Sequence, residues 1–472
     1  MRSFFIFILL LCAAVGVSAQ SGRVAPPTPD EQVADKSSKL SAAELFDETN
    51  AYAKNKFNEF KEKKIPYSEK LRQQTVQEQK QLAAKNAAIL LARTGLAGED
   101  FYFLGMLHWI AENSDGADEA LKKFIAAENP TVEKLQAART VVVILAARRK
   151  NFDEAEKFLS DYLNTNATKA RERLRMESEL AAAYREKNNS ERAAAHAEEA
   201  YRAAKANFQN APTRAAGISE LIENGMIVFE IYRDANQPEK AEKTLGDLQK
   251  TGAFIESTTA YYIAVNERVK YLIDTGRKPA ALQFYKEMLD TAAKDFKTKD
   301  WKNDILSRLN RREKHYQILG ETAPELQEID RWFPGETKKL AELRGKVVLL
   351  DFWATWCDPC YSAFPSLTEW GRKFEKDGLV VLGVTRYYGR DTGEGVKDDA
   401  TEIEYLRKFK KEHNLAYDFV IGKERSNHVA YGADSLPTTV IIDRKGIVRY
   451  AEIGAGREAE IQKKIEKLLA EK

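Results

Sequence analysis

The sequence predicts a multidomain chain in which an all-α helical-repeat solenoid is followed by an α/β domain. Residues 41–319 are rich in Ala, Glu, Lys, Arg and Leu, and their apolar residues recur three and four positions apart, as in amphipathic helices. Residues 320–472 instead alternate short apolar runs with helical segments, which is typical of a sheet flanked by helices. A length of 472 residues leaves room for several domains.

The composition is that of a globular chain with a sizeable core, since 43% of the residues are hydrophobic and 31% are charged. The chain has 74 Lys and Arg residues against 72 Asp and Glu residues, so its formal net charge is only +2. Such a balance favours neither a polyanion nor a membrane surface as partner. We therefore expect a protein or thiol partner and no nucleic acid.

The first 19 residues have the features of a signal peptide. A positive charge precedes an unbroken apolar or small-residue run, and small residues end at Ala19, where we expect cleavage. The run is short for a bilayer span, so an uncleaved membrane anchor is the alternative. Cys12 follows a leucine rather than a small residue, which disfavours lipid attachment. Cleavage would leave an exported, periplasmic or otherwise extracytoplasmic chain whose only cysteines are Cys357 and Cys360.

Residues 20–40 contain three prolines and several small polar residues, which predict a flexible linker. In the helical region that follows, a turn residue repeatedly precedes, by four positions, an alanine that opens an amphipathic helix. The five pairs are Gly116 and Ala120, Asn151 and Ala155, Asn189 and Ala193, Gln237 and Ala241, and Gly276 and Ala280. Successive alanines are 35, 38, 48 and 39 residues apart, which brackets the period of two-helix repeats.

Between residues 101 and 293 this pattern resembles tetratricopeptide-type units, so we expect a tetratricopeptide-like repeat domain over residues 41–319. Helical solenoids present a concave face on which a peptide or protein can dock. The sequence leaves open whether this one docks a partner or serves as a spacer.

The C-terminal region predicts alternating elements after the break at Gly320 and the Pro334-Gly335 turn. We expect strands at residues 346–352, 379–385, 417–421, 438–443 and 447–453, and helices at 402–413 and 458–470. This order predicts a mixed sheet with helices on both faces.

A Cys-x-x-Cys pair follows the first of these strands. At a strand-to-helix junction the first sulfur lies at a helix N-terminus, which favours the thiolate, so Cys357 is the expected nucleophile. Cys360, one turn further on and less exposed, would resolve the mixed disulfide. Pro359 fits a first helical turn, where no N–H is needed. Asp351 would lie buried beneath the sulfurs with a raised pKa, which suits a group that accepts the proton of Cys360.

The segment VVLLDFWATWCDPC resembles the thioredoxin superfamily. With the preceding GETAPEL and the signal peptide, residues 320–472 are similar to the TlpA/ResA group of exported thiol-disulfide oxidoreductases. Pro365 matches the proline that kinks the active-site helix of the superfamily, a structural role that we also expect of Pro359. The resemblance further implies substrate contacts from Trp356 and from a cis-proline loop that contains Leu436 and Pro437.

The same resemblance implies a disulfide-bearing protein substrate, a membrane thiol donor and no cofactor beyond the redox-active disulfide. Asp358 places a negative charge beside Cys357, which opposes thiolate formation and favours a reductase over an oxidase. Two features depart from the group. Many members have Asn where this chain has Asp351, and residues 386–399 are unusually long and polar. A solvated insertion is the favoured interpretation of that segment, and a partner-binding loop is the alternative.

Other functions fit the cysteine pair less well. A zinc site lacks ligands, because there is no second pair and His413 and His428 are not suitably spaced, so we expect no metal. A structural disulfide that closes only two intervening residues would stabilise the chain little. A peroxidase of this fold would need a threonine at Ala354. The remaining alternative is a helical-repeat binding scaffold with an accessory or oxidising redox domain.

Overall fold

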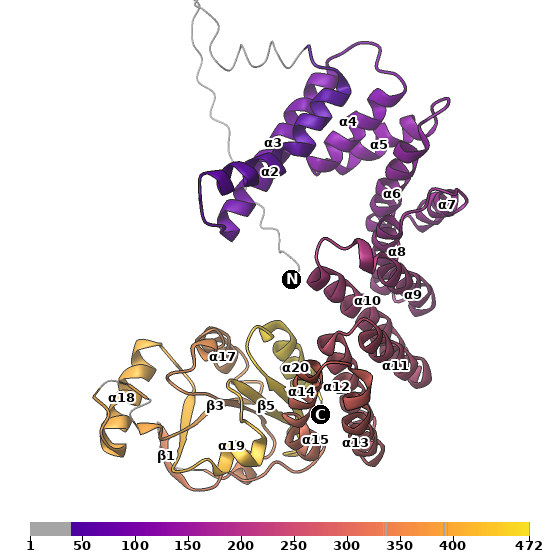
Figure 1. Ribbon diagram of the computed structural model, residues 1–472. Coiled ribbons are helices and arrows are strands. Elements are labelled where there is room, and N and C mark those ends of the chain that lie inside the picture. Colours follow the sequence, from indigo (N-terminus) through magenta and orange to yellow (C-terminus); the bar gives the residue numbers. More distant parts are fainter. Residues whose placement is uncertain (1–38, 334, 336–337, 390–391, 394, 472) are drawn as a thin grey trace, which may run out of the picture. The chain divides into compact units, whose positions relative to one another are not determined.

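The computed structural model describes residues 39–333, 335, 338–389, 392–393 and 395–471. The predicted signal peptide, residues 1–19, lies outside the described residues, as does almost all of the predicted linker, residues 20–40. The chain divides into two compact units, Met1–Glu172 and Arg173–Lys472. The predicted order, a helical region followed by an α/β domain, is confirmed (Figure 1).

The helical region consists of successive helices joined by short turns, and each is described here by its bounds. They are α2 (Ala42–Glu62), α3 (Glu69–Leu91), α4 (Glu99–Ile110), α5 (Ser114–Ile125), α6 (Val132–Arg148), α7 (Phe152–Leu163), α8 (Ala170–Glu186), α9 (Ser190–Asn207), the short 3₁₀ helix η1 (Phe208–Asn210), α10 (Arg214–Asp234), α11 (Pro238–Phe254), α12 (Thr258–Asp274), α13 (Lys278–Asp295), α14 (Lys299–Asn310) and α15 (Glu313–Ile318).

Six of the turns between the described helices share one backbone geometry. A residue with positive φ ends the first helix, and the next residue is the N-cap of the second helix. The N–H of that N-cap residue donates to the carbonyl five positions earlier, as in a Schellman motif. The positive-φ residues are Glu112, Lys150, Asn188, Asn236, Glu256 and Gly276. One turn therefore serves both as the C-cap of one helix and as the start of the next.

This geometry corrects the register of two of the five predicted pairs. In five of these turns a fully buried alanine lies four residues after the N-cap, and these alanines are Ala117, Ala155, Ala193, Ala241 and Ala281. In the turn whose N-cap is Ser257 the same position is the buried Tyr261. The predicted pair Gly116 and Ala120 is thus displaced by three residues, and Ala280 by one, since Ala280 is exposed. A methyl group at the buried position lets the paired helices approach closely, and a larger side chain would separate them.

The α/β domain contains a six-stranded mixed sheet. Its strands are β1 (Ile329–Phe333), β2 (Val347–Phe352), β3 (Leu379–Arg386), β4 (Asp418–Gly422), β5 (Thr438–Ile442) and β6 (Val448–Ile453), in the order β1-β4-β3-β2-β5-β6. β2, β3 and β4 are parallel, and β1, β5 and β6 pair antiparallel with their neighbours. All five expected strands are present. The edge strand β1 was not expected, because it is short and carries two charged residues.

Helices cover both faces of this sheet. The remaining elements are η2 (Leu340–Leu343), α16 (Asp358–Tyr361), α17 (Phe364–Lys373), α18 (Asp399–Glu412), α19 (Ser426–Tyr431) and α20 (Glu458–Ala470). One hydrophobic core joins β2 and β3 to α17, α18 and α20, and it includes both cysteines. The core on the opposite face includes residues of α12 and α15, which belong to the helical region. The mixed sheet with helices on both faces is confirmed, but the helical region supplies part of one layer.

Among the residues that the structure describes, no helix is both long and apolar enough to span a membrane.

Candidate active site

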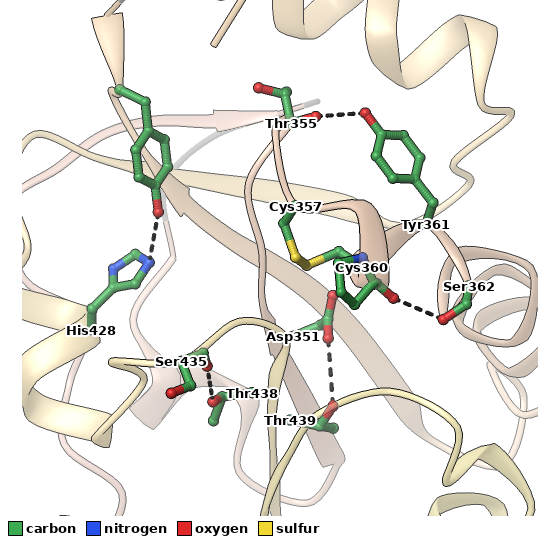
Figure 2. Close-up of a disulfide and its surroundings, with 12 residues drawn as sticks. Asp351, Thr355, Cys357, Cys360, Tyr361, Ser362, His428, Ser435, Thr438 and Thr439 are labelled. Carbon is green, nitrogen blue, oxygen red and sulfur yellow. Dashed lines mark hydrogen bonds between the residues drawn. A yellow bond between two sulfur atoms is a disulfide. The ribbon is translucent and has the colours of Figure 1, made fainter. Parts of the chain in front are cut away.

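The two cysteines form a disulfide between the end of β2 and the start of α16. The bond joins Cys357 and Cys360, whose Cα atoms are 5.4 Å apart. Cys357 is the N-cap residue of α16 and is 4% exposed, whereas Cys360 is fully buried. Of the two bonded cysteines (Figure 2), Cys357 is thus the one that is slightly exposed to solvent.

The helix that begins at the disulfide is shorter than the single kinked helix that the sequence predicts. α16 ends at Tyr361, and α17 begins separately at Phe364. Pro365 lies in the first turn of α17, where its missing N–H is tolerated. Its ring would clash with the carbonyl of Tyr361 if the helix were continuous. Pro359 occupies the corresponding place in α16, as expected from the sequence.

Asp351 lies on the face of the sheet that carries the disulfide. Leu349, two residues earlier in β2, and Trp353, directly after the strand, belong to one hydrophobic core with Cys357 and Cys360. The Asp351 side chain is fully buried, and burial raises its pKa to about 7.

The hydrogen bonding of this carboxyl group is incomplete. The Thr439 hydroxyl is 3.4 Å from Asp351 Oδ1, a long contact that lowers the pKa only slightly (Figure 2). Oδ2 has no hydrogen-bond partner among the described residues. A buried carboxyl group with a free oxygen and a pKa near neutrality can accept and return a proton.

A groove of about 490 Å³ opens beside Cys357. Trp356 and Leu436, two of the three predicted substrate contacts, line it, and half of the Trp356 surface is exposed. Pro437 is buried directly after Leu436, and the peptide bond between these two residues is cis. The structure therefore brings the predicted loop to the disulfide.

Six further residues that line the groove were not identified from the sequence as site residues, and they include Ala433 and Asp434. Arg386 and Tyr388 belong to the segment that was interpreted as a solvated insertion, and Arg425 and His428 lie at and after the start of α19. His428 was considered only as a zinc ligand. Among the described residues, no group of three or more His, Cys, Asp or Glu side chains could hold a metal ion.

A mixed sheet flanked by helices, with a Cys-x-x-Cys disulfide after β2 and a cis-proline loop beside it, defines the thioredoxin-like class. Comparison with known proteins agrees. Residues 319–451 match the family described as AhpC/TSA. The thiol-disulfide oxidoreductase ResA of Geobacillus thermodenitrificans is 31% identical over 156 residues, which are 33% of this chain and 81% of the relative. The chain belongs to the family of thiol-disulfide oxidoreductases that includes ResA.

Two other similar proteins match the same part of the chain. The thioredoxin-like protein YneN of Bacillus subtilis is 30% identical over 132 residues, which are 28% of this chain and 71% of the relative. The crystal structure of a putative thiol:disulfide interchange protein DsbE from Chlorobium tepidum is 27% identical and covers 32% of this chain and 98% of its own, with a TM-score of 0.26. The identity to ResA confirms the sequence-based resemblance to the TlpA/ResA group.

Proposed function

We propose that this protein is an exported oxidoreductase that reduces disulfides of protein substrates through a Cys357–Cys360 dithiol. The observation that carries the proposal is the disulfide at the groove with a buried, incompletely bonded Asp351 on the same face of the sheet. Export is supported by the features of residues 1–19 and by membership of the ResA-containing family.

The reaction transfers two electrons from the protein dithiol to a substrate disulfide. The Cys357 thiolate attacks one substrate sulfur, which forms a mixed disulfide and releases the other substrate sulfur as a thiolate that takes a proton from water. Asp351 then accepts the proton of the Cys360 thiol. The Cys360 thiolate attacks the Cys357 sulfur, which restores the protein disulfide and releases the second substrate sulfur as a thiolate. This thiolate takes up a proton, and Asp351 returns the proton that it accepted to water. A membrane thiol donor returns two electrons to the protein.

The remaining site residues position these reactants. Trp356 offers an exposed ring beside Cys357, and the loop of Leu436, which also lines the groove, and Pro437 provides backbone for a substrate segment. Pro359 and Pro365 fix the first turns of α16 and α17, so that Cys360 stays beneath Cys357.

We assign the domains as residues 1–19 for the signal peptide, 20–40 for the linker, 41–319 for the tetratricopeptide-like repeats and 320–472 for the thioredoxin-like domain. The recurring turn and buried alanine support a repeat architecture. We assign protein docking to the repeats, because solenoids of this kind provide an extended concave surface.

The direction of electron flow is tested by equilibrating the chain from residue 20 onward with a glutathione redox series. The thiols of Cys357 and Cys360 are trapped with a mass tag at each ratio. A midpoint near about −270 mV, the value for thioredoxin, is the result expected of a reductase. A midpoint near about −120 mV would reverse the assignment to an oxidant, and a pair that never titrates would favour the scaffold.

Cys357→Ser separates the enzyme from the scaffold. A scaffold would keep its partner affinity and biological role in this variant, whereas an enzyme would lose turnover. Cys360→Ser should instead accumulate the mixed disulfide on Cys357, because the resolving attack is removed.

A further inference from the structure

The groove beside the disulfide contains a guanidinium group, that of Arg386, which has no carboxylate partner among the described residues. The Arg386 guanidinium lies 4.0 Å from the centre of the Tyr388 ring, and one of its nitrogens donates to the Tyr387 carbonyl at 2.9 Å. It forms no ion pair with any residue that the structure describes. Arg386 is only partly exposed, so its charge is less screened by water than a surface charge would be.

The other charges of the groove do not cancel this one. Arg425 and Asp434 pair with each other at 2.8 Å, and both are mostly exposed. Asp358 is also exposed, so water screens its carboxylate. His428 is buried, and this burial together with the nearby Arg386 and Arg425 guanidinium groups lowers its pKa to about 4. His428 is therefore neutral at pH 7, and the field in this part of the groove is positive.

Residues 386–389 form one wall of the groove, and a buried carboxylate, that of Glu402, holds this wall in place. Glu402 of α18 accepts the backbone N–H groups of Tyr388 at 2.8 Å and Gly389 at 2.9 Å, together with the hydroxyl of Thr392. The Thr355 hydroxyl donates to the Thr392 carbonyl at 2.9 Å. This part of the chain is thus tied to both α18 and the segment that precedes the disulfide, which a solvated insertion would not be.

The same wall supports the exposed tryptophan. The Trp356 ring packs edge-on against Tyr388, with centroids 5.4 Å apart, and Tyr388 in turn lies 3.4 Å from His428 through its hydroxyl. A peptide segment at Cys357 would meet an apolar ring on one side and the Arg386 guanidinium further along. A guanidinium group binds a carboxylate with paired, charge-assisted hydrogen bonds.

We infer that this groove selects disulfide substrates that carry an acidic side chain next to the cysteine attacked by Cys357, with Arg386 as the residue that binds the carboxylate. This inference rests on the proposed function, because it concerns the substrate of that reaction. It assigns a role in specificity to part of the polar segment at residues 386–399.

The test uses three peptides closed by one disulfide and identical except at the positions flanking the cysteines, which carry Glu, Gln or Lys. Each is mixed with the reduced chain from residue 20 onward, and the loss of protein thiols is followed with a mass tag. One protein dithiol gives two electrons to one peptide disulfide. We expect the Glu peptide to react about tenfold faster than the Gln peptide, equivalent to about 1.4 kcal/mol, and the Lys peptide more slowly than both.

Variants assign the preference to one side chain. In Arg386→Gln, the rate with the Glu peptide divided by the rate with the Gln peptide should fall to about one. Arg386→Lys should retain part of this preference. Arg425→Gln should change the ratio by about twofold at most, because Asp434 already pairs with that residue. Arg372→Gln, exposed on α17 and outside the groove, is the matched control and should change nothing.

Failure of the proposed specificity and failure of the proposed reductase function give different results. Equal rates for the three peptides with the unsubstituted chain, or an unchanged ratio in Arg386→Gln, would overturn the inference while leaving the reductase intact. If the preference for the Glu peptide disappears in Arg425→Gln but persists in Arg386→Gln, the assignment to Arg386 is overturned. If the reduced chain reacts with no peptide and not with the neutral hydroxyethyl disulfide, the proposed function itself fails and the inference fails with it.

Discussion

The ammonium group of Lys270 on α12 lies 3.0 Å from the carboxylate of Glu452 on β6, and both side chains are buried. Lys464 and Arg457 also contact this carboxylate, each at 2.7 Å. Burial alone would raise the pKa of Glu452, but the surrounding cations, Lys270 foremost, outweigh it and hold the pKa well below its usual range. The last helices of the helical region are therefore joined to the edge strand of the redox domain by a charged cluster as well as by a shared hydrophobic core.

Glu452→Gln should destabilise the oxidised chain by about 3–5 kcal/mol at pH 7, because it leaves buried cations without their counter-charge. The measurement is urea unfolding of the chain from residue 20 onward. Glu375→Gln, exposed after α17, is the control and should stay within about 0.5 kcal/mol. Equal stability of Glu452→Gln and the unsubstituted chain at pH 7 would show that the cluster contributes nothing.

The difference in the free energy of unfolding between the unsubstituted chain and Glu452→Gln should depend on pH in one direction. A carboxyl group whose pKa is depressed by folding stabilises the folded state fully above its unfolded pKa of about 4.3. That stabilisation is lost as the pH falls through the lower folded value. The free energies of unfolding of the unsubstituted chain and Glu452→Gln should therefore converge below about pH 4. A difference that widens there would contradict the assignment.

Asp351 should have the opposite effect on stability. Its folded pKa of about 7 lies above its unfolded value, so the folded chain binds an extra proton between about pH 4 and pH 7, and its stability falls as the pH rises through that window. Asp351→Asn removes this loss, which amounts to at most about 4 kcal/mol by pH 8. Unfolding in urea at pH 4, 6 and 8, with the exposed Asp377→Asn as control, measures it. Parallel profiles for the Asp351→Asn and unsubstituted chains would refute the raised pKa.

The same substitution should slow the resolving step. Asn cannot accept the proton of Cys360, so the mixed disulfide on Cys357 should persist about a hundredfold longer, the usual size of a general-base contribution. Rapid acid quenching followed by mass analysis of the mixed disulfide measures its lifetime. Formation of that species should be less affected than its decay. A variant whose mixed disulfide decays at the normal rate would exclude Asp351 as the proton acceptor.

The chemistry of the site could be predicted from the sequence because its residues are close in sequence or belong to recurrent motifs. Asp351, Cys357 and Cys360 all follow from one strand and the turn after it. The groove could not be predicted in the same way, because Arg386 ends β3 whereas Arg425 precedes α19. Only the sheet order brings these two ends to the disulfide.

In the helical region, too, one part of the structure could be predicted from the sequence and another could not. Amphipathic periodicity identified helices throughout, since spacing alone determines which face is apolar. The repeat register was wrong at two turns. At the first, Glu112 has the positive φ and Gly116 lies inside α5; at the second, Gly276 has the positive φ, so the N-cap is the next residue, Arg277. Asn tolerates that conformation, but Glu112 and Lys150 carry no sequence signal for it. There the hydrogen bonds of the turn and the packing around it determine the backbone conformation.

Gly383 on β3 should not tolerate a side chain, because an added Cβ would lie 2.8 Å from Trp353 Nε1 and 3.1 Å from the Tyr417 ring. Gly383→Ala should destabilise the chain by about 1–3 kcal/mol, the usual effect of overpacking a core. Gly371→Ala in α17 is the matched comparison, since its Cβ would have only ordinary contacts with Val381 and alanine favours a helix. It should be neutral or stabilising by up to about 1 kcal/mol. Thermal unfolding of both variants would separate a local clash from a general intolerance of substitution.

Glu402 should act as a positioning residue for the groove rather than as a contact of the substrate. Glu402→Gln leaves one carbonyl oxygen where the carboxylate had two acceptors, so one of the N–H groups of Tyr388 and Gly389 loses its bond. An unsatisfied buried donor costs about 1–3 kcal/mol, which should appear mainly as local opening of this wall. Hydrogen exchange at these two amides should accelerate by at least tenfold, and chymotrypsin should cleave after Tyr387 or Tyr388 sooner.

The matched control is Glu404→Gln on the same helix, whose exposed carboxylate pairs at the surface with Arg407 at 3.5 Å. That variant should change neither exchange nor cleavage. In Glu402→Gln the rate preference for the Glu peptide should fall, because Tyr388 no longer holds Arg386 in place, while the reduction midpoint of the disulfide should stay the same. A shifted midpoint would mean that Glu402 acts on the cysteines themselves, and unchanged exchange would mean that the wall does not depend on its carboxylate.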